Sequence, residues 1–229
     1  MPMFRRYAIY YTPPDGALAD FGAAWLGWDI ARRVSVPHLV MDGLPAPVSD
    51  ITERPRRYGL HATIKPPFML AKARHVEELQ AAFDAFCATR APVTLPGLTL
   101  APLGRFLALI PSTPCAAVTD LAAHAVRHLD DFRAPPDRET LDRYRTGLLT
   151  PSQEQNLQNW GYPHVMDAFR FHITLSGKLP KRQVAVLTAA LAAHVEPLLP
   201  APFVLDALSL VGEDEDGRFH LIRRVALSR

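Results

Sequence analysis

The chain of 229 residues has little of several features that would place it quickly. It contains only two cysteines, Cys87 and Cys115, and a chain of this length needs no disulfide to fold, so two reduced thiols are expected. No apolar stretch reaches the ~18 residues of a membrane span. The first residues lack the apolar core of a signal peptide. We therefore expect a cytoplasmic protein with no membrane association.

Charge of one sign is also lacking. Lysine and arginine together number 25 and aspartate and glutamate 23, a formal net charge of +2. This balance excludes a polycationic coat for nucleic acid, and basic residues do not alternate with aromatic ones as in long single-strand binders. We expect a small phosphorylated substrate as the partner and no long nucleic acid. A monomer is the default expectation.

Familiar chemical motifs are missing as well. The chain has no GxxxxGK[ST], GxGxxG, GxSxG or HExxH sequence. His124 and His128 are four residues apart on an expected helix, but no carboxylate follows them in the zincin pattern. We interpret them as helix-surface or partly buried histidines. The sequence thus predicts no metal and no cofactor.

Proline is what the chain has in excess, with 22 residues, about twice the average share of ~5%. Many prolines mark the ends of expected elements, as at Pro66-Pro67. Twice the expected order is strand, helix and hairpin, over about residues 58–110 and 168–227. This repeat predicts an α+β fold of two pseudo-symmetric lobes of antiparallel sheet with flanking helices. No linker separates them, so residues 1–229 are predicted to form a single bilobal domain.

The informative pattern is His-x-Thr, which occurs once in each repeat. The first copy is Tyr-Gly-Leu-His-Ala-Thr-Ile-Lys at residues 58–65, and the second is Phe-Arg-Phe-His-Ile-Thr-Leu at residues 169–175. Side chains alternate along a strand, so each histidine shares a face with its threonine while apolar residues take the other face. On this alternation Lys65 and Arg170 join the polar faces. Two edge strands with a solvated polar face are the alternative interpretation.

The two strings, with the opening Arg6-Tyr7-Ala8-Ile9-Tyr10-Tyr11, resemble the 2H phosphoesterase superfamily, and in particular a branch grouped with phosphonate metabolism. The resemblance covers about residues 4–227. It implies a metal-independent enzyme in which the His-x-Thr strands of two lobes meet in a central cleft. By the same resemblance, His61 and His172 are the acid–base pair, and Thr63 and Thr174 bind the phosphoryl oxygens.

The chemistry also fits the residue types. Opening a cyclic phosphate needs a base for water and an acid for the leaving oxygen, and histidine serves as either near neutral pH. Lys65, Arg170 and Arg105 are candidates to offset charge on the phosphoryl group, although a surface role is the stronger expectation for Arg105. Tyr162 is a candidate to line the site; a packing role is equally expected.

Three functions follow in order of preference. The first is hydrolysis of a small cyclic phosphodiester, with ribose 1,2-cyclic phosphate of phosphonate catabolism as the first substrate. The second is hydrolysis of RNA or nucleoside 2′,3′-cyclic phosphates. RNA-processing relatives often carry arginine five residues after the second histidine, where this chain has Gly177, so a smaller substrate is favoured. The third is a non-catalytic protein that binds a phosphorylated ligand.

Overall fold

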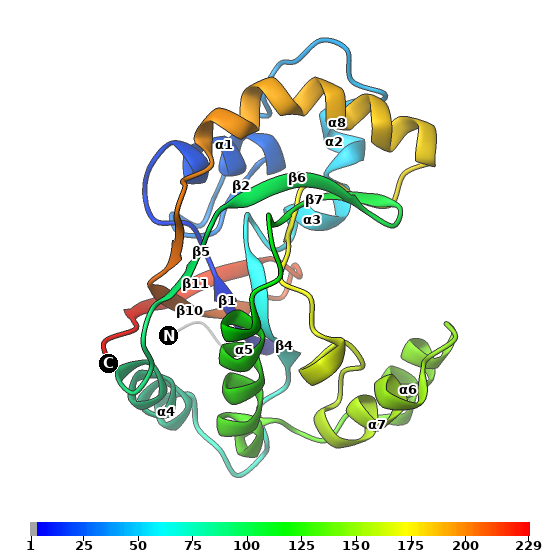
Figure 1. Cartoon of the computed structure of the whole chain (residues 1–229). Helices are drawn as coiled ribbons and strands as arrows, with labels where there is room; N and C mark the ends of the chain where they lie inside the picture. Colours follow the sequence, from blue (N-terminus) through cyan, green and yellow to red (C-terminus); the bar gives the residue numbers. More distant parts are fainter. Residues whose placement is uncertain (1–3) are drawn as a thin grey trace.

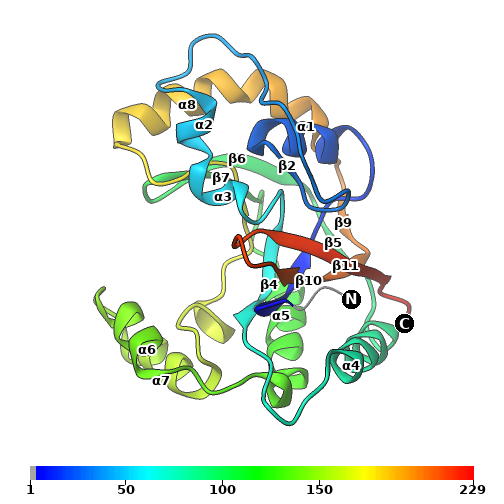
Figure 2. The same cartoon turned by 180° about the vertical axis from the view of Figure 1, so that it is seen from behind.

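The fold is built on one antiparallel sheet of seven strands, in the order β11-β10-β1-β4-β8-β7-β6, in a computed structural model that describes residues 4–229. Helices pack against the sheet at both ends (Figures 1 and 2). The strands of this sheet are β1 (Arg6–Tyr11), β4 (Ala62–Phe68), β6 (Leu98–Leu103), β7 (Phe106–Pro111), β8 (Ile173–Thr174), β10 (Ala207–Glu213) and β11 (Phe219–Ala226). The predicted α+β class with antiparallel strands is confirmed.

Short strands and helices complete the described chain. The short strands are β2 (Trp28–Asp29), β3 (Val34–Ser35), β5 (Val93–Leu95) and β9 (Phe203–Leu205). The α-helices are α1 (Ala17–Leu26), α2 (Val48–Ile51), α3 (Glu53–Arg56), α4 (Val76–Ala88), α5 (Ala116–His128), α6 (Arg138–Arg145), α7 (Pro151–Trp160) and α8 (Lys181–Val195). Three 3₁₀ turns are η1 (Asp130–Phe132), η2 (Met166–Ala168) and η3 (Glu196–Leu198).

The predicted repeat is present in the order of elements, since β4 and β8 are each followed by a helix, a short strand and a hairpin. The helix of each repeat packs on the hairpin of the other repeat. Helix α4 follows β4 but packs on β10 and β11, whereas α8 follows β8 and packs on β6 and β7. The short strands β5 and β9 pair with each other where the two connections meet. As a result the two motif strands, β4 and β8, become neighbours at the centre of the sheet.

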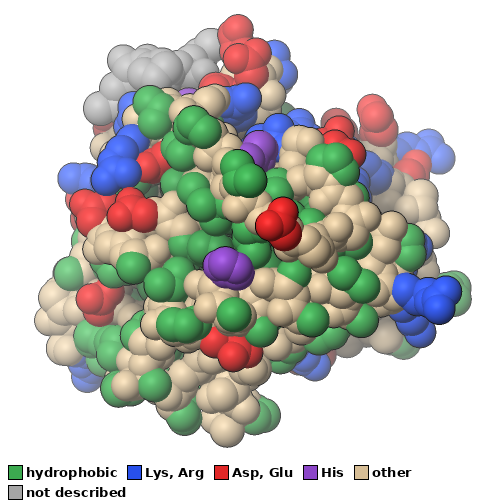
Figure 3. All heavy atoms as spheres, turned by 90° about the horizontal axis from the view of Figure 1, so that it is seen from above, with side chains coloured by type: hydrophobic (Ala, Val, Ile, Leu, Met, Phe, Trp, Pro, Cys, Tyr) green, Lys and Arg blue, Asp and Glu red, His purple; other side chains and the backbone are tan. Residues whose placement is uncertain are grey.

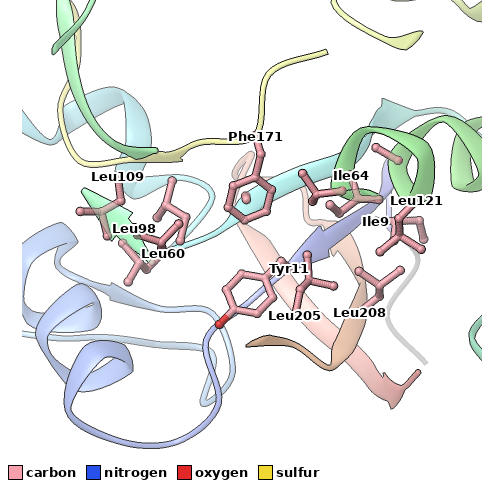
Figure 4. Packing of buried hydrophobic residues seen from close by; sticks show 14 of the residues in the cluster. Ile9, Tyr11, Leu60, Ile64, Leu98, Leu109, Leu121, Phe171, Leu205 and Leu208 are labelled. Carbon is pink, nitrogen blue, oxygen red and sulfur yellow. The ribbon is translucent and has the colours of Figure 1, made fainter. Parts of the chain in front are cut away.

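The apolar faces of the motif strands are buried as alternation predicts. Leu60, Ala62 and Ile64 in the first copy are at most 4% exposed, and Phe171 and Ile173 in the second are at most 5% exposed. Figure 4 shows Phe171, Leu60 and Ile64 directed into the same cluster as Ile9 and Leu121. Burying large apolar side chains stabilises the fold by about 1.5–3 kcal/mol each. The core therefore fixes which face of β4 and β8 is left for polar groups.

The boundaries of β4 differ from the sequence prediction of a strand over residues 58–65. The strand begins at Ala62 and runs through Pro66 and Pro67 to Phe68. Proline is tolerated here because β8 pairs with β4 only at Ala62, which leaves the outer edge of β4 free beyond that point. The pairing with β1 also shifts register on both sides of Ile9. These irregularities change the direction in which the Lys65 side chain points.

Two of the other elements are short. Helix α1 ends at Leu26, because Gly27 adopts a left-handed conformation at φ 75° and caps it. Strand β8 is shorter than the second His-x-Thr string and consists of Ile173–Thr174. Helices α6 and α7 occupy much of the chain between residues 133 and 163.

The surface carries no dominant charge on the face that Figure 3 shows, where basic and acidic side chains lie scattered among hydrophobic and uncharged ones. This distribution matches the small formal net charge of +2. Over residues 4–229, none of the helices combines the length and the apolar character needed to cross a membrane. Cys87 and Cys115 are free thiols.

Candidate active site

The two His-x-Thr motifs come together on one face of the sheet. Ala62 of β4 pairs directly with Ile173 of β8, and both side chains are in the core. Their neighbours point to the opposite face. Antiparallel pairing therefore sets His61 across from Thr174 and Thr63 across from His172. Diagonal neighbours such as the two histidines are roughly 7–8 Å apart at the backbone. The motif strands lie side by side, as the resemblance implied.

His61 is held in one tautomer by its own backbone. Its Nδ1 lies 2.9 Å from the carbonyl oxygen of Gly59. A carbonyl oxygen only accepts, so Nδ1 carries the hydrogen and donates it. Nε2 is then the unprotonated nitrogen, and the Thr63 hydroxyl lies 3.3 Å from it as a donor. His61 thus presents an unprotonated Nε2 on the face it shares with Thr63.

His172 repeats this arrangement. Its Nδ1 lies 2.7 Å from the carbonyl oxygen of Arg170, two residues before it, just as Gly59 stands two residues before His61. Nδ1 therefore donates here as well, and Nε2 is available. Two imidazoles fixed through Nδ1 leave their Nε2 atoms for a ligand. This orientation by a backbone partner is the one general acid–base chemistry needs.

Burial sets the proton affinity of His61. Desolvation lowers the pKa of His61 to about 4 from its usual 6.5; the hydrogen bond to Gly59 opposes this fall, and the charge of a protonated His172 adds to it. The mutual effect of the two rings is consistent with their shared face. At neutral pH His61 is accordingly neutral and suited to accept a proton.

Aromatic rings flank both histidines. The Tyr10 ring lies 4.0 Å from the His61 ring between centroids, and Tyr58 lies 5.6 Å from it. On the other side, Phe106 of β7 lies 5.8 Å from the ring of His172. These contacts limit the motion of the imidazoles and exclude water from part of each ring. They account for the half-buried state of His61 and His172.

The expectation that Lys65 shares the polar face is wrong. Tyr10 pairs with Thr63, but Ile9 pairs with Lys65, so Ile64 is an extra residue at a bulge. A bulge resets the alternation, and Lys65 turns toward α5. Its ammonium is 3.1 Å from both the carbonyl oxygen of Val126 and a carboxylate oxygen of Asp130, with only 1% of the residue exposed. Lys65 is a buried structural cation.

The remaining predicted substrate-binding residues are Arg170, Arg105 and Tyr162. Arg170 is exposed, donates to the carbonyl oxygens of Asp167 and Phe169, and lies at the edge of a groove of about 550 Å³ beside the start of α5. Arg105 is exposed in the β6–β7 turn, with one long contact of 3.5 Å to the carbonyl oxygen of Leu179. Neither guanidinium is brought to the histidines by these contacts. Tyr162 is half-buried, and its ring lies 5.7 Å from that of His164.

Sequence reasoning missed two residues that lie close to the motif. The Tyr10 ring lies tilted against that of His61, and Arg6 on the same strand is held in a bidentate pair by Glu213, with one contact of 2.6 Å. Alternation along β1 was the available signal, because residues 6, 8 and 10 share one face. Arg6 is the cation that influences the phenol of Tyr10. In residues 4–229, no three His, Cys, Asp or Glu side chains are grouped closely enough to hold a metal ion.

Curated relatives match most of this chain. A protein of Janthinobacterium sp. (strain Marseille), named ribose 1,5-bisphosphate phosphokinase PhnN, is 34% identical over 218 residues, which is 93% of this chain and 48% of that protein. A protein of the same name from Laribacter hongkongensis (strain HLHK9) is 35% identical over 228 residues, covering 97% and 52%. The chain therefore spans about half the length of these relatives.

Solved structures that align with this chain have low sequence identity to it. The crystal structure of E. coli LigT complexed with 3′-AMP aligns with 99% of this chain and all of the LigT chain, at 14% identity and a TM-score of 0.44. TT0787 of Thermus thermophilus aligns over 97% of both chains, at 13% identity and a TM-score of 0.45.

A family model places the chain more firmly. The model described as "Protein of unknown function (DUF1045)" matches residues 63–220, from the threonine of the first motif through the second motif and into β11. This match covers more than half of the sequence. The chain belongs to the DUF1045 family.

Proposed function

We propose that this protein is a metal-independent phosphodiesterase of the 2H type that hydrolyses a small cyclic phosphodiester. The observation that carries the proposal is the pairing of Ala62 with Ile173, which places two histidines and two threonines on one face of the sheet. Two proton carriers and two hydroxyl donors around one position match what in-line attack of water on a cyclic phosphate requires.

In the proposed step, one water molecule adds across a bond between phosphorus and a ring oxygen of the cyclic phosphate. His61 Nε2 removes a proton from water as the water oxygen bonds to phosphorus. The bond from phosphorus to one ring oxygen breaks, and His172 Nε2 delivers a proton to that oxygen, which leaves as a hydroxyl. The product is a phosphate monoester, with no change in oxidation state. The hydroxyls of Thr63 and Thr174 donate to the non-bridging oxygens as charge builds on them.

The assignment of base and acid rests on the environments of the two rings. His61 is neutral in the free protein, and its Nε2 is an acceptor already approached by the Thr63 hydroxyl. That state is the one a general base needs. His172 then supplies the proton to the leaving oxygen, with its ring oriented by the Nδ1 bond to the Arg170 carbonyl.

The substrate we favour is a ribose 1,2-cyclic phosphate that bears a 5-phosphate. Cleavage of its bond between phosphorus and O2 would give ribose 1,5-bisphosphate, the compound in the name of the relatives that contain a half similar to this chain. An enzyme of this kind would supply the substrate of the phosphokinase that those relatives are named for. The kinase activity itself is not carried over to this chain.

The test is hydrolysis of a panel of cyclic phosphodiesters followed by ³¹P NMR in ¹⁸O-labelled water with EDTA present. The panel contains ribose 1,2-cyclic phosphate with and without a 5-phosphate and nucleoside 2′,3′-cyclic phosphates. We expect turnover of the ribose 1,2-cyclic esters with one ¹⁸O atom in each new monoester. Faster turnover of the nucleoside 2′,3′-cyclic phosphates would instead indicate that the substrate is an RNA or nucleoside cyclic phosphate. No turnover of any member would favour a binding protein, and activity that needs a divalent ion would refute the mechanism.

The pH dependence should reveal the base. Protonation of His61 removes the lone pair that accepts the water proton, and its pKa is lowered to about 4. The acidic limb of kcat/KM, which reports the free enzyme, should therefore lie below about pH 5. Steady-state rates across pH 3.5–9, with the fold followed by circular dichroism, provide the measurement. An acidic limb near an ordinary histidine pKa of 6.5 would argue against His61 as the base.

The threonine hydroxyls should matter less than the histidines. Thr63→Val and Thr174→Val keep the side-chain shape but remove a donor to the phosphoryl oxygens, so each should cost about 1–3 kcal/mol of transition-state stabilisation in kcat/KM. Thr99→Val is the matched control, because Thr99 is exposed on β6. Equal rates for all three variants and the wild type would remove the threonines from the site.

A further inference from the structure

One solvent-facing surface beside the motifs is apolar. The buried face of the hairpin β6–β7 consists of Leu98, Leu100, Leu107 and Leu109, each at most 9% exposed. The other face carries five apolar side chains, which we call the hairpin platform: Ala101, Leu103, Phe106, Ala108 and Ile110. All of them except Ala108 are half-buried and reached by solvent. Because the solvated face of an antiparallel sheet usually carries polar side chains, an apolar one beside a candidate site indicates a surface that binds a ligand.

The register of the sheet places the platform next to the motifs. Ala108 pairs with Thr174 of the second motif on one side and with Ala101 of β6 on the other. His61 lies across from Thr174, so one row over the sheet consists of His61, Thr174, Ala108 and Ala101. Neighbouring strands are about 4.8 Å apart. The platform therefore begins one strand beyond the second motif.

Three platform residues lie near His172. When the pairing of Ala108 with Thr174 is continued by two residues, Ile110 comes level with His172 on the same face. The ring of Phe106, whose partner across the hairpin is Leu103, lies 5.8 Å from the ring of His172. A group attached to a phosphate between the two histidines thus reaches the platform without crossing another strand.

The opposite side of His61 is closed by aromatic rings. Tyr10 of β1 and Tyr58 flank the imidazole, at 4.0 and 5.6 Å between centroids. Phe219 of β11 packs on both tyrosines, at 5.6 Å from Tyr10 and 5.2 Å from Tyr58. Its backbone N–H donates to the Arg57 carbonyl oxygen at 2.7 Å, which holds the ring in place. The remaining part of a ligand held between the histidines is therefore directed away from β1 and toward β7.

A groove large enough for a small molecule lies at the platform. Its volume is about 550 Å³, and it is lined by Leu103 and Ile110 of the platform, by Arg170 and Phe171 beside His172, and by the start of α5. Small-molecule sites typically have about 300–1,000 Å³. Among the described residues that line the groove, Arg170 alone is charged. The groove therefore suits a ligand whose surface toward the platform is apolar.

We propose that the hairpin platform binds the pentose ring of a cyclic phosphodiester whose phosphorus lies between His61 and His172. The C–H groups of the sugar pack on Ile110 and Leu103, while the motif residues orient the phosphoryl group. An apolar wall with a few polar groups that fix orientation is the usual make-up of a small-molecule site. This inference rests on the proposed function, since it adds the site for the non-reacting part of the same substrate.

Two substrates separate the platform from the chemistry. Ribose 1,2-cyclic phosphate carries the pentose, whereas ethylene phosphate has the same five-membered cyclic diester without a sugar. Ile110→Ala and Leu103→Ala remove apolar contact area, so each should lower kcat/KM about tenfold for the ribose ester and much less for ethylene phosphate. Ile110→Leu keeps the area and should retain most of the rate.

The matched control is Val204→Ala, because Val204 is 41% exposed on β9, outside the seven-stranded sheet. It should leave the rates on both substrates unchanged. Equal losses on the two substrates in the Ile110→Ala and Leu103→Ala proteins, or no loss on either, would overturn the platform.

A binding measurement separates this inference from the proposed function. If the wild type hydrolyses neither ester, calorimetry compares its affinities for ribose 1-phosphate and inorganic phosphate. At least tenfold tighter binding of the sugar phosphate, lost in Ile110→Ala but kept in Val204→Ala, would support the platform even though the catalytic proposal had failed. Equal affinities, or no binding of either by a folded wild type, would overturn the platform as well.

Discussion

His61→Gln and His172→Gln are each expected to lower kcat at least about 100-fold, because each removes one of the two proton carriers in the proposed step. Glutamine keeps a polar side chain of similar reach but cannot exchange a proton near neutral pH. The two groups act on the same transition state, so the double variant should be little worse than either single one. Rates on the best substrate of the panel, measured by ³¹P NMR, provide the comparison.

The control for this loss is His194→Gln, since His194 is exposed near the end of α8 and away from both motifs. It should retain the wild-type rate. All variants should show the wild-type circular dichroism spectrum, because His61 and His172 are half-buried side chains outside the apolar core. Near-wild-type turnover by a folded His61→Gln or His172→Gln protein would defeat the two-histidine mechanism.

Asp130→Asn is expected to destabilise the fold by about 3–5 kcal/mol, because it leaves a buried ammonium without its counter-charge. The carboxylate of Asp130 accepts from Lys65 at 3.1 Å and from Arg133 at 2.9 Å. Lys65→Met removes the buried charge and replaces it with an apolar side chain of similar length. That variant should be close to neutral in stability and fully active.

Urea denaturation of both variants tests this expectation, with Asp120→Asn on the exposed side of α5 as the matched control.

Burial lowers the pKa of Lys65 to about 8, an effect that the charge of Asp130 opposes. Between that value and the usual 10.5 the unfolded chain binds the proton more tightly, so wild-type stability should gain from this group as the pH rises through the window. Lys65→Met should lack this gain. Loss of activity in a stable Lys65→Met protein would indicate that Lys65 contributes to the active site.

Alternation along the motif strands was sufficient to predict which of their residues are buried in the core. The apolar faces of residues 60–64 and 171–175 are buried as expected, because burial of one face is what specifies a strand's orientation. The repeated order of strand, helix and hairpin was also visible in the sequence. The exchange of helices between the halves was not, because only tertiary packing decides which hairpin a helix covers.

Lys65 shows where alternation fails. A single extra residue at Ile64 turns the side chain to the other face, and no letter in the sequence marks a bulge of this kind. The contacts of Tyr144 and Tyr162 were equally hidden, since they join a surface helix to a loop that follows another helix. Arg6 and Tyr10 could have been found, because they share the face of β1 that adjoins the first motif.

The most direct test of a single site built from both motifs is a crystal structure of the protein with vanadate, an oxyanion that mimics the phosphoryl group in the transition state. We predict one vanadate within about 3 Å of Nε2 of both His61 and His172, with its equatorial oxygens accepting from the hydroxyls of Thr63 and Thr174. An oxyanion bound by one motif alone, or elsewhere on the protein, would contradict a single site built from both motifs.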